Sequence, residues 1–309
     1  MSMTSRWAIA VYVALVICLG WAASAWGQDC PPLSEYRRAV LLAEHLFGGR
    51  PSNGEILVRR AYVTEYDALR RVPRWVAWHA MPGYLQTPKR AGRWASFRID
   101  REVPNPVRST DYLDLLDTRD LARGHLAPYF IAGGDRNGDG VMAAINSPDD
   151  LTVADIEDAC TVFEVNFMSN IAPQLHSRFN GSGGLWNQLE TRVREDVVGR
   201  GKTVHVIAGP VFGNAPVEHV GPNADIQVPQ MFYKLLISDP GVAAFLFAHP
   251  GRIGTKGCAL DAVLDDCIVT VADIESLTGL DFFAGLDDSS EALLEGTDGR
   301  AVWHVLLGE

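Results

Sequence analysis

One histidine of the sequence stands in the stretch "ARGHLAPYF", Ala122–Phe130, beside an arginine and a glycine and ahead of an apolar run. A neutral imidazole can take a proton from water near neutral pH, and an arginine can hold an anion through two parallel hydrogen bonds. Taken alone, His125 also fits a structural histidine whose ring nitrogens are satisfied by hydrogen bonds. His125 and Arg123 therefore indicate chemistry only when other polar side chains join them.

Such side chains follow in the stretch Asn166–Glu190, which contains Asn170, Gln174, Asn180 and Glu190. Amide oxygens and one carboxylate suit Mg²⁺, which prefers few protein ligands and keeps several waters, and they do not suit zinc. An asparagine followed by glycine, as at Asn180, is also a common turn pair, and Glu190 also fits a solvated helix position. Together with His125, the set indicates a magnesium site.

A second metal pattern lies in an insert at about residues 133–160. Oxygen-bearing side chains alternate there and are followed by a glycine, as in the first half of a calcium loop: Asp135, Asn137 and Asp139. The twelfth loop position is Asn146 instead of the usual glutamate, which leaves Asp149 or Asp150 as replacement ligands. The sequence therefore suggests a Ca²⁺ site, and an ion-free Asn/Asp/Gly turn is the alternative.

The elements that must position these residues are mostly strands. Runs rich in β-branched and aromatic residues predict strands within 57–67, 75–81, 203–213, 231–239 and 242–250, with a break of the third at Gly209-Pro210. A helical stripe joins Trp186, Leu189, Val193 and Val197, and Thr270–Gly279 has the start and stop signals of a helix. Because the strands come in runs, the sequence favours an α+β domain.

The chain has 309 residues, of which 47% are hydrophobic and 21% charged, a composition typical of globular proteins. Residues 1–27 resemble a secretory signal, with Arg6 ahead of an apolar run that ends in small residues, and an uncleaved membrane anchor is the alternative. We therefore expect a signal peptide at 1–27 and one domain at 28–309, secreted or periplasmic, or membrane-anchored if the signal is retained.

Four cysteines remain after that segment, an even number that permits disulfides in an exported protein: Cys30, Cys160, Cys258 and Cys267. The short separation of Cys258 and Cys267 makes them the first predicted pair and leaves Cys30 with Cys160 by elimination. Four free thiols are the alternative.

The formal net charge of −11 argues against binding of polyanions by bulk attraction. Residues 55–108 are nevertheless basic, and residues 287–309 are acidic. These basic residues either share one positive face or are separately solvated.

Several short stretches resemble one known family. "RGHLAP", "MSNIAPQ", Asn180 and "LWNQLE" resemble, in this order, the sugar-non-specific DNA/RNA endonucleases of the ββα-metal (His-Me finger) class, which include endonuclease G. "RRAYVTEYD", "RVPRWVAWH", "RWASFRID", "AGPVFG" and "TVADIESLTGLDFFAGL" are similar to family segments before and after that core. The resemblance implies a ββα-metal core on a central, mainly antiparallel sheet flanked by helices.

The resemblance also implies roles for single residues. His125 would be the general base, Asn180 the direct ligand of Mg²⁺, for which Mn²⁺ can substitute, and Glu190 a carboxylate that holds water on the metal. The remaining catalytic or substrate-binding positions are Arg93, Arg123, Asn170, Gln174 and Arg194. The implied activity is hydrolysis of phosphodiester bonds in DNA and RNA that leaves 5′-phosphate and 3′-hydroxyl ends.

Two departures from the family pattern stand out. Ala122 occupies a position where the family usually has an acidic or amide side chain, and Asp120 is a nearby candidate to replace it. The insert and the stretch "NGSGGLWNQLE" also lengthen the spacing between site residues. The alternatives are a catalytically weakened binding protein with a calcium-dependent contact loop, and a phosphodiesterase for small substrates. No protein partner is evident, and the oligomeric state stays open.

Overall fold

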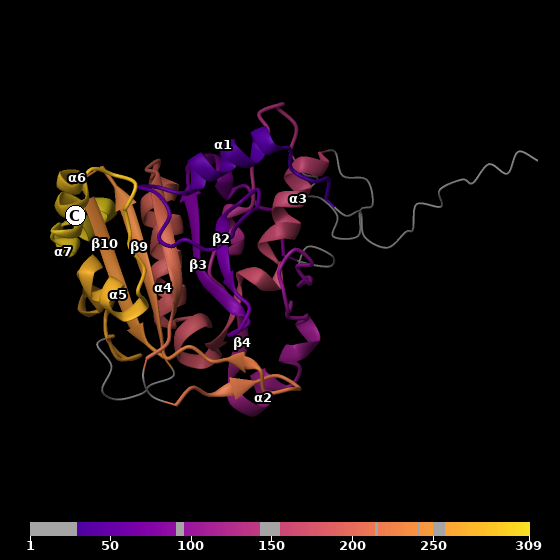
Figure 1. The fold of residues 1–309 in the computed structure, drawn as a ribbon. Helices are drawn as coiled ribbons and strands as arrows, with labels where there is room; N and C mark the ends of the chain where they lie inside the picture. The colour runs from indigo at the N-terminus through magenta and orange to yellow at the C-terminus, as the bar shows by residue number, and fades with distance from the viewer. Residues whose placement is uncertain (1–29, 91–95, 143–154, 214–215, 240, 250–256) are drawn as a thin grey trace, which may run out of the picture. The chain divides into compact units, whose positions relative to one another are not determined.

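A large antiparallel sheet supports the rest of the fold (Figure 1). The computed structural model describes residues 30–90, 96–142, 155–213, 216–239, 241–249 and 257–309. The chain divides into two units, Met1–Pro31 and Pro32–Glu309, and the elements below belong to the second. The predicted signal or anchor segment lies outside the described residues, as do Arg93, Asn146, Asp149 and Asp150.

The described strands are β1 (Ile56–Val58), β2 (Val63–Asp67), β3 (Val72–Ala80), β4 (Leu121–His125), β5 (Ile171–Leu175), β6 (Val204–Val211), β7 (His219–Val220), β8 (Ile226–Gln227), β9 (Met231–Ser238), β10 (Gly241–Ala248) and β11 (Ile268–Val269). Seven form one sheet in the order β1-β2-β3-β6-β9-β10-β11, and each neighbouring pair is antiparallel. The strand pairs β4-β5 and β7-β8 stand apart from it.

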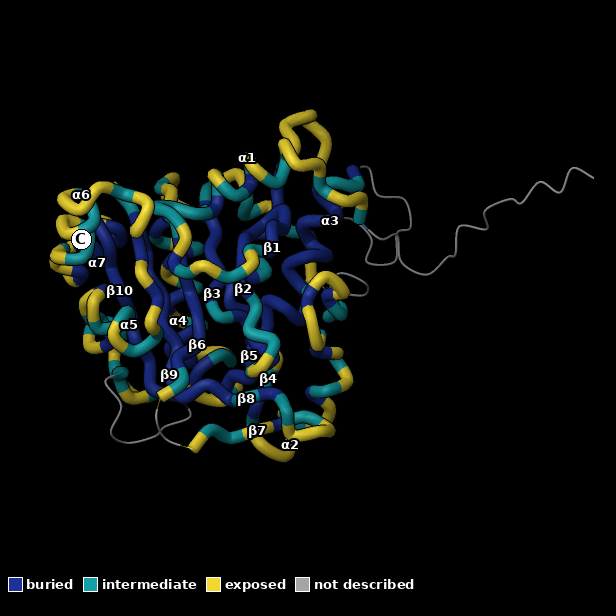
Figure 2. The backbone as a smooth tube through the Cα atoms, viewed as in Figure 1, coloured by how far each residue is buried: buried dark blue, intermediate teal, exposed yellow. Residues whose placement is uncertain are grey.

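The described helices are α1 (Glu35–His45), α2 (Leu115–Arg119), α3 (Ile156–Val165), α4 (Leu185–Arg192), α5 (Val271–Thr278), α6 (Asp288–Glu295) and α7 (Gly299–Leu307). One core lies between the sheet and α1 and α5, and the other joins the opposite face to α4, α7 and the pair β4-β5. Both faces are thus covered, which explains why β10 is buried along its whole length (Figure 2). The predicted α+β class with an antiparallel sheet flanked by helices is confirmed.

Local signals explain where single elements begin and end. The Thr270 side chain accepts a hydrogen bond from the Asp273 amide at the start of α5, and Gly279 ends that helix in the left-handed conformation. The predicted break at Gly209-Pro210 is wrong, because β6 continues to Val211. The pairing of β6 with β3 ends at Ala208, two residues before Pro210. Proline has no backbone N–H to donate, but at this position no hydrogen bond to β3 is lost.

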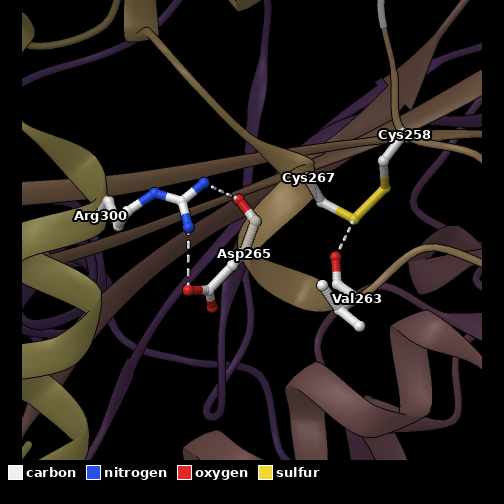
Figure 3. The surroundings of a disulfide bond; sticks show 5 residues. All are labelled: Cys258, Val263, Asp265, Cys267 and Arg300. Carbon is white, nitrogen blue, oxygen red and sulfur yellow. Dashed lines mark hydrogen bonds and ion pairs between the residues drawn. A yellow bond between two sulfur atoms is a disulfide. The ribbon is translucent and has the colours of Figure 1, made fainter.

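The disulfide between Cys258 and Cys267 is confirmed (Figure 3). Cys30 and Cys160 are also disulfide-bonded. Beside the first disulfide, the Arg300 guanidinium donates to the carboxylate and the carbonyl of Asp265, at 3.0 and 2.8 Å. These bonds connect α7 to the turn that precedes Cys267. None of the helices in the described ranges is long and apolar enough to cross a membrane.

Candidate active site

A pocket of about 490 Å³ opens beside β4. It is lined by the end of β4, by the segment after it, by the turn that follows β5 and by α4. β4 and β5 are antiparallel, with His125 opposite Ile171, and α4 follows them in the chain. This is the predicted order of two strands and a helix. Five predicted site residues line the pocket: Arg123, His125, Asn180, Glu190 and Arg194.

His125 ends β4, and one hydrogen bond fixes its ring. Nε2 of His125 lies 3.1 Å from Oδ1 of Asn166, and Nδ2 of Asn166 donates to the Val162 carbonyl at 3.1 Å. The bond to Val162 determines which way the amide faces, so Nε2 of His125 is the protonated ring nitrogen. Nδ1 is therefore the nitrogen that can act as a base. Asn166 was not among the predicted site residues.

Burial keeps the His125 ring neutral. The side chain is only 8% exposed. Burial, and to a smaller extent the charge of Arg90, lower the pKa of His125 to about 3, against the opposing hydrogen bond with Asn166. A neutral imidazole is the form that can accept a proton.

Asn170 holds the backbone beside His125. Its Oδ1 accepts from the Ala127 amide, and its Nδ2 donates to the carbonyls of Ala127 and Val165, all at 2.9 Å. Its own carbonyl accepts from the Leu126 amide at 3.0 Å. The side chain is fully buried and is not among the pocket-lining residues. Asn170 thus fixes the backbone directly after His125.

Asn180 reaches the pocket from a π turn, His176–Asn180, that directly follows β5. Asp120 anchors this turn: its carbonyl accepts from the His176 amide at 2.7 Å, and its carboxylate accepts from the amide and hydroxyl of Ser177. Asp120 therefore connects the turn to the start of β4. Ala122 itself lines the pocket, so no polar side chain enters the pocket at that position.

Glu190 lies on α4, and a buried lysine of β9, Lys234, donates a hydrogen bond to its carboxylate. Nζ of Lys234 lies 3.1 Å from Oε1 of Glu190 and 3.7 Å from the centre of the Trp186 ring. Lys234 is 1% exposed. Burial raises the pKa of Glu190, and the charge of Lys234 opposes that rise; burial also lowers the pKa of Lys234. This pair fixes one carboxylate oxygen of Glu190. Lys234 was not predicted.

Three pocket arginines lie over aromatic rings. The distances from the guanidinium carbon Cζ to the ring centre are 5.2 Å for Arg90 over Phe97, 5.3 Å for Arg90 over Tyr129, 4.8 Å for Arg123 over Phe97 and 5.8 Å for Arg194 over Phe130. Burial lowers the pKa of Arg90, and the charge of Arg123 lowers it further. The positive charges of Arg90 and Arg123 therefore repel each other in the pocket. A negatively charged phosphate group bound between arginines would reduce such repulsion. Arg90 was not predicted, although it lies three residues from Arg93, which is outside the described residues.

Gln174 is not brought to the pocket. It is fully buried, and it stands opposite Ala122 in the pairing of β4 with β5. A Cβ atom at Gly124 would lie 1.9 Å from its Oε1, so a glycine at this position allows the close approach of the two strands. Among the described residues, neither polar atom of the Gln174 side chain has a hydrogen-bond partner.

The donor set of the pocket fits a hard cation. The amides of Asn180 and Asn187 and the carboxylate of Glu190 face one cavity with His125 and His176. Few oxygen ligands and room for water suit Mg²⁺. Within the part of the chain that the structure describes, no three His, Cys, Asp or Glu side chains lie close enough together, as they stand, to hold a metal ion, so any metal site requires side chains to move or amide oxygens and water to contribute. Asn180 and Glu190 are therefore the residues that would hold Mg²⁺.

The predicted calcium residues form a loop whose side chains are not among those that line the pocket. Both carboxylate oxygens of Asp135 accept backbone amides, those of Gly138 and Gly140 at 2.7 Å. Oδ1 of Asn137 accepts from the Asp139 amide at 3.0 Å. The predicted ligands thus lie together on one tight turn.

Comparison with known proteins identifies the family. The family model described as "DNA/RNA non-specific endonuclease" matches residues 47–289. A Nostoc protein named "Nuclease" is 24% identical and spans 96% of this chain and 98% of its own length. A Serratia marcescens protein of the same name is 26% identical over 81% of this chain and 84% of that protein.

One further relative is similar in sequence, and one solved structure shares the fold. The mouse protein named "Nuclease EXOG, mitochondrial" is 26% identical over 74% of this chain, which spans only 57% of that relative. The solved structure titled "Crystal structure of the EndoG/EndoGI complex: Mechanism of EndoG inhibition" has a chain with the same fold, with a TM-score of 0.57, 21% identity and coverage of 82% of this chain and 95% of that one. The chain therefore belongs to the DNA/RNA non-specific endonuclease family, a family of hydrolytic nucleases, as its motifs predicted.

Proposed function

We propose that this protein is an exported, magnesium-dependent nuclease that hydrolyses phosphodiester bonds in both DNA and RNA. One observation carries the proposal: a neutral histidine, an asparagine, a glutamate and three arginines line a single pocket. None of these groups requires a 2′-hydroxyl on the substrate, so the same chemistry serves both polymers.

In this proposal His125 activates the attacking water. Nδ1 takes a proton from the water as its oxygen forms a bond to phosphorus, and the bond from phosphorus to the 3′ oxygen breaks. The hydrogen bond with Asn166 keeps the other ring nitrogen protonated and the ring in place. The departing oxygen gains a proton from the surrounding water, which leaves a 3′-hydroxyl and a 5′-phosphate.

The other pocket residues hold the substrate and the metal. Arg90, Arg123 and Arg194 can bind the non-bridging phosphate oxygens. Asn180, with Glu190 beside it, would hold Mg²⁺, and Mn²⁺ could substitute for it; the bound ion supplies electrostatic stabilisation of the charge that develops on the phosphate. Arg93 remains a proposed phosphate contact, and Asn170 is proposed as a positioning residue.

Export is supported by the cysteines. The disulfide Cys258–Cys267 and the bonded Cys30 and Cys160 are typical of proteins outside the reducing cytosol. The alternative of a binding protein without turnover is not favoured, because His125, Asn180 and Glu190 are retained together in one pocket.

The test is digestion of plasmid DNA and of RNA by the purified protein, with Mg²⁺ or with a chelator, beside the variant His125→Ala. We expect wild type to degrade both polymers in Mg²⁺, and the variant to lose roughly 100-fold to 10,000-fold in rate, the usual contribution of a general base. Circular dichroism of the variant controls for folding. Equal digestion by both proteins, or digestion by neither, contradicts the proposal.

A further inference from the structure

We propose that the loop Asp135–Gly140, together with Asp155 and Asp158 at the start of α3, is a binding site for Ca²⁺. This site is separate from the pocket and does not depend on the proposed reaction. It uses the first half of the predicted calcium loop, but it replaces the loop's missing second half with carboxylates of a helix that follows later in the chain.

The loop is already folded around its oxygen atoms. Gly138 and Gly140 have φ values of 79° and 83°, which glycine adopts without strain and other residues rarely do. The resulting turn carries an oxygen-bearing side chain at every second position, namely the carboxylates of Asp135 and Asp139 and the amide of Asn137 between them. Carboxylate and amide oxygens are the ligands that Ca²⁺ uses.

The Asn137 amide marks where a cation would lie. Its Nδ2 lies 3.2 Å from Oδ2 of Asp139 and 3.0 Å from Oδ2 of Asp155, between one carboxylate of the loop and one of the helix. In this structure an N–H donor occupies the position between these two carboxylates. Rotation of the amide by half a turn would point its oxygen to the same place, and the three oxygens could then contract around an ion.

Asp158 gives an independent indication of a missing ligand. It is 1% exposed, its Oδ1 accepts from the Arg136 amide at 2.8 Å, and its Oδ2 has no hydrogen-bond partner among the described residues. Asp135, Asp139 and Asp155 all lie close enough to repel its charge. A buried carboxylate oxygen without a partner is costly, and a bound cation would remove that cost.

The charge of Arg136 attracts that of Asp158, but the Arg136 guanidinium makes no hydrogen bond to the Asp158 carboxylate. The Arg136 guanidinium turns away and donates to the carbonyls of Ile131, Gly133 and Arg60. Arg60 itself pairs with Glu157 and Glu164. An ion that accepts many oxygen ligands without strict geometry fits such a site, which favours Ca²⁺ over Mg²⁺.

The proposed ion would act on the fold. α3 begins at the site and ends next to Asn166, the residue that holds His125. Ca²⁺ would therefore fasten one end of the helix whose other end orients the histidine.

The test is calorimetric titration of chelator-treated full-length protein with CaCl₂, and separately with MgCl₂, followed by thermal unfolding. We expect binding of Ca²⁺ and a rise in Tm of about 5 °C at saturation, since a ligand that binds only the folded state stabilises it. The variants Asp139→Asn, at an exposed position, and Asp158→Asn should each weaken Ca²⁺ binding at least tenfold.

Two control variants locate the site. Asp261→Asn makes the same charge change at an exposed position elsewhere and should keep the full rise in Tm. Glu190→Gln alters the pocket and should also keep it. The proposal is overturned if wild type shows neither heat nor a shift in Tm with Ca²⁺, or if both Asp139→Asn and Asp158→Asn bind Ca²⁺ as wild type does.

Discussion

His125 is hydrogen-bonded at one ring nitrogen by Asn166, a residue that lies outside the motif of the histidine. The motif "RGHLAP" and the oxygen-bearing residues after it predict His125, Arg123, Asn180 and Glu190 only when they are taken together, because each residue alone also fits a structural role. Asn166 and Lys234 were not found, because each acts through one side-chain hydrogen bond to a residue 41 or 44 positions away. Such a bond leaves no periodic signal in the sequence.

The first residue-scale prediction concerns the pH dependence of activity. Because the folded pKa of His125 is lowered to about 3, the ring stays neutral, and able to act as a base, well below pH 6.5. The variant Asn166→Asp keeps an acceptor for Nε2 but adds a negative charge, which raises the pKa of His125. We expect the acid limb of kcat/KM against pH to lie below 6.5 in wild type and to move upward in the variant. Asn166→Leu should lose activity without that movement.

The second concerns Lys234. The variant Lys234→Met leaves the Glu190 carboxylate without its buried partner, so we expect the free energy of unfolding to fall by about 3 kcal/mol and activity to fall with it. The double variant Lys234→Met with Glu190→Gln removes both charges. It should recover stability in urea unfolding while activity stays low. Recovery of activity by the double variant would contradict a positioning role for Lys234.

At the scale of elements, strands were more predictable than helices. The strand runs at 203–213, 231–239 and 242–250 correspond to β6, β9 and β10, because a buried strand must be apolar along its length. The run Leu57–Asp67 was read as one strand but forms β1 and β2, which pair with each other. α1 and α3 were missed, since their polar positions obscure the apolar stripe.

Three histidines join α1 to the sheet. His45 of α1 accepts at Nδ1 from the His79 amide at 3.4 Å, and the rings of His79 and His205 stack with centroids 4.1 Å apart. Burial lowers the pKa of all three, to about 4 for His45 and His205. The negative charge of Glu44 raises the pKa of each histidine and so opposes the effect of burial. The positive charge of Arg136 lowers the pKa of His45 and His79 further.

This cluster predicts a loss of stability in mild acid. Between pH 6.5 and about 4 the unfolded forms of His45 and His205 bind protons that the folded forms do not, so unfolding is favoured as pH falls through that range, by up to about 1.4 kcal/mol per pH unit for the fully buried His45. Urea unfolding of wild type and of His205→Gln at pH 7.5, 6 and 5 tests this. The variant should lose less stability on acidification, and identical slopes would contradict the expectation.

At the scale of the whole molecule, acidic neighbours offset much of the positive charge in the described part of the basic segment 55–108. Five of its arginines pair with acidic residues, three of them with buried side chains and two with exposed ones: Arg59 with Asp100, Arg60 with Glu164 and Arg71 with Asp111, and Arg70 with Asp67 and Arg74 with Glu65. Among the described arginines of this segment, Arg90 lines the pocket. In a chain of net charge −11, the three arginines that line the pocket are a local source of attraction for a polyanion.

The disulfide Cys258–Cys267 also has a consequence for solubility. Two short segments cover the edge of β10 that does not pair with β9: β11 pairs with Ala244 and Phe245, and Cys258 bonds to the backbone of Leu246 and Ala248. Each cysteine belongs to or adjoins one of these segments. The bond therefore holds in place the cover of a long, apolar strand, which would otherwise be an edge open to pairing with another chain.

Reduction is thus expected to cause self-association as well as a loss of about 2 to 3 kcal/mol of stability. Light scattering of the protein with and without reductant, below the unfolding temperature, measures this. The double variant Cys258→Ser with Cys267→Ser should scatter like the reduced protein in either condition. If the reduced protein and the variant both remain monomeric, the disulfide does not protect the edge of β10. If both aggregate, the chain is protected from aggregation through this edge only after the disulfide has formed.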